Sequence, residues 1–164
     1  MKCFGDGFNA PIVMQSVKRL TVTDFDPLFI QDARDRRRAP WLYEAEVLDI
    51  LNEEIKGSYD AIYSLDVLEH LDRVHEPEVM RKITGALTDT GVAIIGMPSL
   101  ESQLYASPAS REGHINCKTA PDFKALMLQY FHSVFMFSMN DEVVHTGHHK
   151  MAHYLLALCY QKKV

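Results

Sequence analysis

Features that mark membrane, secreted or metal-knuckle proteins are scarce in this sequence. No apolar run approaches the ~20 residues that a membrane-spanning helix needs, so we expect no membrane partner. The N-terminal segment carries one lysine followed by glycine, aspartate and asparagine, which is not the pattern of a signal peptide. The cysteines are widely spaced and odd in number, which predicts reduced thiols in a cytoplasmic protein without a disulfide framework or a CxxC metal knuckle.

An excess of positive charge is also missing. The chain has 17 Lys and Arg against 22 Asp and Glu, which gives a net charge of −5 at pH 7. Tight binding to a nucleic-acid backbone usually needs a basic face, so this balance argues against a nucleic-acid partner. The composition, 47% hydrophobic and 24% charged over 164 residues, is that of a globular protein, and we expect a single domain over residues 1–164.

Apolar segments of strand length alternate with longer amphipathic segments, which predicts an α/β domain. The expected strands cover residues 19–24, 43–49, 59–66, 91–98, 132–138 and 151–160. The expected helices cover residues 11–17, 27–38, 76–87 and 119–130. A turn is expected at Thr90-Gly91, and residues 99–118 are expected to form a long functional loop without regular structure.

The order of these elements predicts a Rossmann-like fold. Right-handed crossovers place successive strands in a doubly wound, mostly parallel sheet between helices, a three-layer α/β/α sandwich. The last two strands form a hairpin across the polar segment 139–150, so the final strand runs antiparallel, and His153 is expected to pack within it. Ligands of such sheets bind beyond the carboxyl ends of the parallel strands, where we expect the functional site.

Acidic residues stand at three of the expected strand ends. Asp24, Asp49 and Asp66 each close a strand, and the next strand closes at Pro98. Carboxylates accept hydrogen bonds, so they suit the ribose hydroxyls and the exocyclic amine of a nucleoside. Each aspartate could instead cap the helix that follows it, which is the simpler interpretation for a single residue. Three of them in register favour a ligand site.

A glycine-containing segment near the N-terminus supports the same interpretation. Gly5, Asp6 and Gly7 precede a helix-like stretch. Glycines at such a place let backbone amides approach an anionic or carboxylate-bearing ligand at the start of a helix. The segment also comes before the strand that ends in Asp24, which is the order expected of a nucleotide site.

Histidines gather in the two connections that reach this edge. His114 lies in the long loop, and His145 and His149 lie between the last two strands. A histidine that titrates near neutral pH is a natural general base for a hydroxyl or an amine, so these three are the candidate catalytic residues. A divalent metal held by Asp141, Glu142 and these histidines, or a merely solvated hairpin tip, are the alternatives, and we assign no metal ligand.

The stretch YDAIYSLDVLEHLDRV (residues 59–74) resembles the fourth-strand motif of small-molecule class I S-adenosylmethionine-dependent methyltransferases, in which the strand is followed by evlEHl. Other segments resemble the family's motifs in the same order. They are residues 5–8 for the glycine-rich motif, 23–26 for the acid after the second strand, 47–50 for the third strand and 91–98 for the fifth. Four residues precede Gly5, so we expect the chain to be N-terminally short and to lack the family's first strand.

The resemblance implies S-adenosylmethionine as the cofactor and a role for each matching residue. In the family's pattern the methionine part of the cofactor is bordered by Gly5, Asp6 and Gly7 and by Leu65 and Asp66. Asp24 accepts hydrogen bonds from both ribose hydroxyls, and Phe25 lies against adenine. Asp49 accepts from the adenine amine, and Ile50 packs on the adenine ring. Glu69 and His70 are expected to start the next helix rather than to react.

We therefore expect an S-adenosylmethionine-dependent methyltransferase that acts on a small polar metabolite, with a sugar or a sugar nucleotide as the first candidate. A histidine-rich tip that is poor in aromatic residues suits a hydroxylated substrate better than a nucleic acid. The alternative is a truncated, non-catalytic methyltransferase-like domain, whose exposed sheet edge mediates binding or formation of a homodimer.

Overall fold

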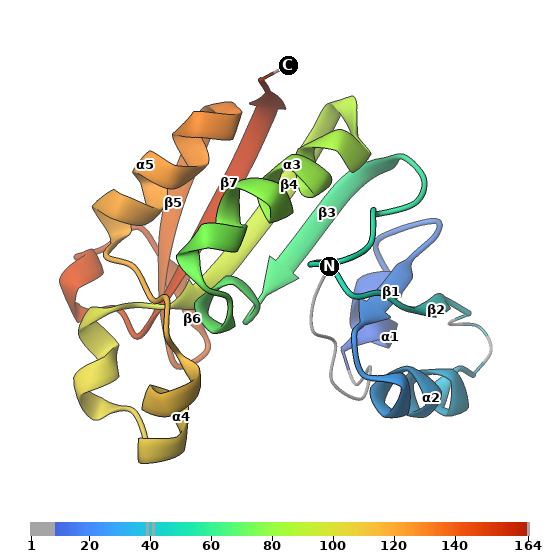
Figure 1. Cartoon of the computed structure of the whole chain (residues 1–164), viewed down its shortest axis with the longest axis horizontal. Coiled ribbons are helices and arrows are strands. Elements are labelled where there is room, and N and C mark those ends of the chain that lie inside the picture. Colours follow the sequence, from blue (N-terminus) through green and yellow to red (C-terminus); the bar gives the residue numbers. More distant parts are fainter. Residues whose placement is uncertain (1–8, 39, 41, 164) are drawn as a thin grey trace. The chain divides into compact units, whose positions relative to one another are not determined.

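The computed structural model describes residues 9–38, 40 and 42–163 (Figure 1). The predicted glycine motif, Gly5, Asp6 and Gly7, lies outside the described residues. The chain divides into two compact units, Met1–Glu54 and Ile55–Val164, and each has its own sheet. Among the described residues, no helix is both long and apolar enough to cross a membrane.

The first unit contains a small parallel sheet packed against a helix. Its elements are α1 (Ala10–Met14), β1 (Thr21–Asp24), α2 (Pro27–Arg36) and β2 (Glu44–Val47). Val22 and Ala45 pair across the sheet and are buried, as are Ile30 and Ala33 of α2. The register also pairs Asp24 with Val47, so both strands end at the same edge of the sheet, as predicted.

The second unit is built on a five-stranded sheet. Its strands are β3 (Tyr59–Leu65), β4 (Leu87–Pro98), β5 (Phe131–Asn140), β6 (Val143–His145) and β7 (Tyr154–Lys162), in the spatial order β3-β4-β7-β5-β6. β3 and β4 are parallel, whereas β7 is antiparallel to both of its neighbours, β4 and β5. β5 therefore runs in the direction of β3 and β4. The Rossmann-like α/β fold with an antiparallel final strand is confirmed.

Two helices, α3 (Glu76–Ala86) and α5 (Ala120–Tyr130), cover one face of this sheet (Figure 1). Their apolar faces bury Ile83 and Phe123 completely, over small and aliphatic strand residues such as Ala93 and Ala157. Thr119 begins α5 as predicted, because its hydroxyl accepts a hydrogen bond from the amide of Asp122 (3.3 Å). The apolar periodicity of these segments is thus explained by packing on the sheet.

The connections contain more structure than expected. Short helices occupy η1 (Leu68–His70), η2 (Arg73–His75), η3 (Glu101–Tyr105), α4 (Pro108–Gly113) and η4 (His149–Met151). The expectation of a structureless loop over residues 99–118 was wrong, because η3 and α4 lie in it. The Ser107 hydroxyl accepts a hydrogen bond from the amide of Ser110 (3.1 Å) and so caps α4.

Two strands begin three or more residues away from the predicted position. β4 begins at Leu87, directly after α3, and Leu87 is buried and pairs with Tyr59 of β3. The next pair is Ala61 with Val92, so residues 88–91 bulge out of the ladder within β4, where a turn at Thr90-Gly91 between helix and strand was expected. β7 begins only at Tyr154, and His153 is exposed rather than packed in a strand. The amide of His153 donates to the side-chain oxygen of Asn140 (3.0 Å), which holds this residue outside the sheet pairing.

Candidate active site

In the first unit, Asp24 presents an unsatisfied carboxylate oxygen at the end of β1. The residue is 2% exposed, and its Oδ1 accepts a hydrogen bond from the amide of Asp26 (2.9 Å). Its Oδ2 is buried without a hydrogen-bond partner among the described residues. A buried acceptor without a donor is costly, so this oxygen is suited to a ligand hydroxyl, as predicted for ribose. Phe25, the next residue, is 63% exposed, so its side chain is accessible to a ligand.

The second predicted acid, Asp49, follows β2 and organises its own turn. Its Oδ1 accepts from the amide of Leu51 (3.0 Å), and its Oδ2 accepts from the side-chain amide of Asn52 (2.7 Å). Ile50 is buried. These contacts fix the position of the Asp49 side chain just after β2, where the adenine amine is predicted to bind. The nucleoside residues of the first unit therefore fit the cofactor that the resemblance implies.

In the second unit, Asp66 turns the chain at the end of β3. Its φ of 56° is in the left-handed region, which aspartate tolerates better than most residues, and its amide donates to the carbonyl of Gly96 (3.1 Å). The turn leads directly into η1, where Leu68 is buried. Burial and the nearby Asp66 carboxylate raise the pKa of Tyr154, so its hydroxyl stays protonated beside this turn.

Glycine is required beneath this turn, at Gly96 of β4. A Cβ atom there would lie 2.7 Å from Leu156, 2.8 Å from Leu65 and 2.8 Å from Tyr154. Three neighbours at such distances leave no room for a larger residue. The close packing holds the end of β3 against β4 and β7, and thereby fixes the position from which Asp66 and η1 begin.

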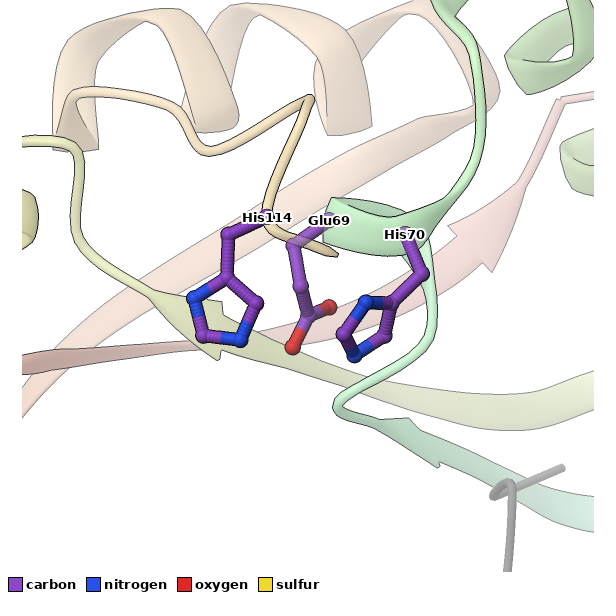
Figure 2. Close-up of side chains that lie close together, drawn as sticks. All are labelled: Glu69, His70 and His114. Carbon is purple, nitrogen blue, oxygen red and sulfur yellow. The ribbon is translucent and has the colours of Figure 1, made fainter. Parts of the chain in front are cut away.

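Glu69, His70 and His114 come together shortly after the Asp66 turn (Figure 2). Glu69 and His70 lie on η1, and His114 follows α4. One potential ligand atom of each residue lies within 4.8 Å of the other two, and the imidazole rings meet edge to face with centroids 5.1 Å apart. Figure 2 shows the Glu69 carboxylate between the two rings.

The Glu69 carboxylate is fully buried. Neither of its oxygens accepts a hydrogen bond from the residues that the structure describes. Burial, with a smaller contribution from the carboxylate of Asp66, raises the pKa of Glu69 to about 8. A buried acid of this kind holds a proton near neutral pH, or needs a cation beside it.

Both histidines are oriented through one ring nitrogen. Nδ1 of His70 lies 2.9 Å from the carbonyl oxygen of Gly113, and Nδ1 of His114 lies 3.0 Å from Oε1 of Gln103. Because both partners are acceptors, Nδ1 carries the proton in each ring and Nε2 has the free lone pair. Burial lowers the pKa of His114, and the neighbouring His70 lowers it too, so His114 is held neutral.

A buried polar network places the segment that carries His114. The side-chain amide of Asn116 donates to the carbonyl of Leu68 (3.2 Å) and to Oε1 of Glu76 (2.6 Å), and the Asn116 backbone amide donates to the carbonyl of Glu69 (3.0 Å). Lys118 donates to Oδ1 of Asn116 (3.0 Å) and pairs with Glu76 (2.5 Å). This network ties residues 116–118 to η1 and to the start of α3.

In the structure, His114 lies beside two residues to which the sequence analysis had given no role in the site. Glu69 and His70, expected only to start a helix, form the cluster with it; an acid and a histidine side by side directly after a strand end were the available signal. Among the described residues, His145 and His149 are not part of this group. His145 accepts from the amide of Gly147 (2.9 Å), and their catalytic role stays a prediction.

Comparison with known proteins identifies a family. The family model described as "Methyltransferase domain" matches residues 5–93, more than half of the chain. No curated protein matches the sequence.

Several solved structures share the fold. One is a chain of the complex between the Haloferax volcanii Trm112 methyltransferase activator and a putative methyltransferase (TM-score 0.79, 12% identity, 99% of this chain and 81% of that chain). A second is the methyltransferase domain of bacterial CtHen1-C (TM-score 0.78, 15% identity, 99% of this chain and 88% of that chain). A third is the N-methyltransferase NodS from Bradyrhizobium japonicum WM9 in complex with S-adenosylhomocysteine (TM-score 0.68, 20% identity, 98% of this chain and 74% of that chain). The chain therefore belongs to the methyltransferase-domain family and is a class I S-adenosylmethionine-dependent methyltransferase.

Proposed function

We propose that this protein transfers the methyl group of S-adenosylmethionine to a hydroxyl of a small polar metabolite, with a sugar or a sugar nucleotide as the first candidate. The observation that carries the proposal is the buried Oδ2 of Asp24 at a strand end, which has no hydrogen-bond partner among the described residues, in a chain of this family. The acceptor class is supported by the neutral His114, because a hydroxyl must lose its proton when it is methylated.

The nucleoside part of the cofactor is assigned to the first unit. Asp24 Oδ2 would accept from the ribose hydroxyls, Phe25 would lie against adenine, and Asp49 and Ile50 would hold the amine and the ring. Leu65 and Asp66 of the second unit are assigned to the methionine part, and Gly5, Asp6 and Gly7 keep their predicted role there. When bound, S-adenosylmethionine supplies a methyl group activated by a sulfonium.

The chain's own residues then have to position the acceptor and take a proton. The acceptor oxygen would bond to the methyl carbon, and the electron pair of the broken carbon–sulfur bond would stay on sulfur. Nε2 of His114 would take the hydroxyl proton, because its Nδ1 is already protonated toward Gln103. His145 and His149 are the other proposed proton acceptors. Holding the two substrates in line contributes roughly 7–11 kcal/mol in favourable cases.

Calorimetry with S-adenosylhomocysteine tests the cofactor assignment. The wild type should bind, and Asp24→Asn should weaken binding at least tenfold while it keeps an oxygen for the amide of Asp26. Asp32→Asn, an exposed acid on α2, is the matched control and should bind as the wild type does. Unchanged affinity in Asp24→Asn would remove the assignment. No binding to the wild type would instead favour the non-catalytic binding module.

A further inference from the structure

We propose that Glu69, His70 and His114 form a binding site for a divalent transition-metal ion. The three side chains come from two separate segments, η1 and the residue after α4, and place one potential ligand atom each within 4.8 Å of the others. Two imidazoles and one carboxylate make up a common ligand set for Zn²⁺, Co²⁺, Mn²⁺ and Fe²⁺.

The Glu69 carboxylate is the first reason for the assignment. It is 0% exposed, and neither oxygen has a hydrogen-bond partner among the described residues. Figure 2 shows it pointing between the two imidazoles. Buried carboxylates in proteins are normally paired with a cation, bonded to donors or bound to a metal, and a cation at this point would satisfy both oxygens.

The orientation of the histidines is the second reason. A histidine that binds a metal through Nε2 usually donates its Nδ1 proton to a carbonyl or carboxylate, which fixes the ring and its tautomer. Both histidines have such partners, the carbonyl of Gly113 for His70 and Oε1 of Gln103 for His114. Each ring therefore keeps an unprotonated Nε2. The partners belong to α4 and η3, so the loop over residues 99–118 builds the site.

Charge and distance are compatible with an ion. The carboxylate of Asp66 is close enough to act on Glu69, so a dication would meet two negative charges. Tetrahedral ligand atoms ~2.1 Å from one ion are ~3.4 Å apart, so a pair at the 4.8 Å limit needs to close by about 1.4 Å. Rotation of the exposed His70 side chain provides such a movement. Three protein ligands leave positions open for water or for another oxygen.

One consequence rests on the proposed function. With the ion bound, Nε2 of His114 is a ligand and no longer takes a proton. An acceptor hydroxyl on an open position of the ion has a lowered pKa and can then be deprotonated with less help from a base. The metal-loaded protein thus prepares the acceptor through the ion, and the metal-free protein through His114.

Cobalt titration of the full chain, prepared without a histidine tag and freed of metal with EDTA, tests the site. We expect one Co²⁺ ion to bind to each chain. Calorimetry and visible absorption spectroscopy measure this binding. His70→Gln and His114→Gln should each lower the affinity for Co²⁺ at least tenfold. His132→Gln, an exposed histidine on β5 outside the cluster, is the matched control and should bind as the wild type does.

Glu69→Gln separates metal binding from a purely structural role. In EDTA this variant should melt no lower than the wild type, because an amide costs less to bury than a carboxylate, whereas Co²⁺ should no longer raise its melting temperature. The proposal is overturned if Co²⁺ does not bind, or if it binds equally well to the three variants. Because binding of S-adenosylhomocysteine is measured without Co²⁺ and depends on Asp24, a failure of either assignment is recognised independently.

Discussion

Two buried acids show how single residues can provide unpaired carboxylate oxygens for a ligand. Asp24 and Glu69 are both buried, and each has a carboxylate oxygen without a partner among the described residues. Asp24 could be predicted from sequence, because it ends a strand of β-branched residues and acids at such ends face ligands. Glu69 could not, because its burial depends on how η1 packs. A buried acceptor left unpaired costs about 1–3 kcal/mol, and a charged one costs more, so both residues are placed at a cost in stability that a ligand can offset.

The two described cysteines provide a test of burial at the residue scale. Cys117 is 3% exposed and Cys159 is 0% exposed, and burial raises the pKa of Cys117 to about 11 and of Cys159 to about 12. Both thiols should therefore resist iodoacetamide at pH 8 in the folded protein, because only the thiolate reacts. Peptide mass spectrometry should find them alkylated only after unfolding in guanidinium chloride. Rapid labelling of Cys159 in the folded chain would contradict its position between β4 and β5.

At the scale of elements, side-chain hydrogen bonds around Asn116 hold a segment in place that lies in no long helix or strand. Residues 116–118 have no regular hydrogen-bond ladder, yet Asn116 links the carbonyls of η1 with Glu76 of α3 and with Lys118. Each of these groups is buried, so each needs its partner. The segment before it, which carries His114, is held in place from one side by this network.

Asn116→Ala should accordingly be destabilising. The change removes one of the two donors to the Leu68 carbonyl and the side-chain acceptor that Arg73 and Lys118 share, which should cost about 2 kcal/mol. Thermal melting should show a fall of about 4–8 °C for a chain of this size. Asn52→Ala is the control, since Asn52 is exposed and its side chain bonds only to Asp49 among the bonds described. Its melting temperature should fall by less than half as much as that of Asn116→Ala. Equal losses would mean that burial of the network is unimportant.

The elements that sequence analysis missed are short. α4 has six residues and β6 has three, and periodicity cannot be recognised over such lengths. The Ser107-Pro108 start of α4 was a readable signal, because a capping serine followed by proline is typical of a helix N-terminus. β6 carries no comparable signal, since it exists through its pairing with β5, where His145 opposes Ser138. Long helices such as α5 were predicted almost to the residue.

At the scale of the whole molecule, the two units differ in how much sheet they contain. β7 is paired on both sides along most of its length, whereas within the part of the chain that the structure describes β1 and β2 pair only with each other. Two-stranded sheets are only marginally stable by themselves, and local opening is easiest where few contacts are made.

Hydrogen exchange should reflect this difference. Amides of β7 should exchange at least about 100-fold more slowly than those of β1 and β2, because β7 opens only when the central sheet unfolds. Exchange mass spectrometry of the full chain measures both sets in one experiment. Equal protection in β1 and β7 would show that the chain opens as one cooperative unit, which would support the single domain expected from the sequence.

The sequence by itself determined the alternation of strands and helices, the direction of the last strand and the acids at strand ends, because these follow from local periodicity and from chain order. Motif order was also sufficient to place the chain among the methyltransferases. Only the tertiary structure decided that Glu69 and His70 meet His114, since His70 and its partner Gly113 are 43 residues apart in the sequence. That encounter depends on how the loop returns to η1 and is held there by buried hydrogen bonds, and no periodic pattern encodes a return of this kind.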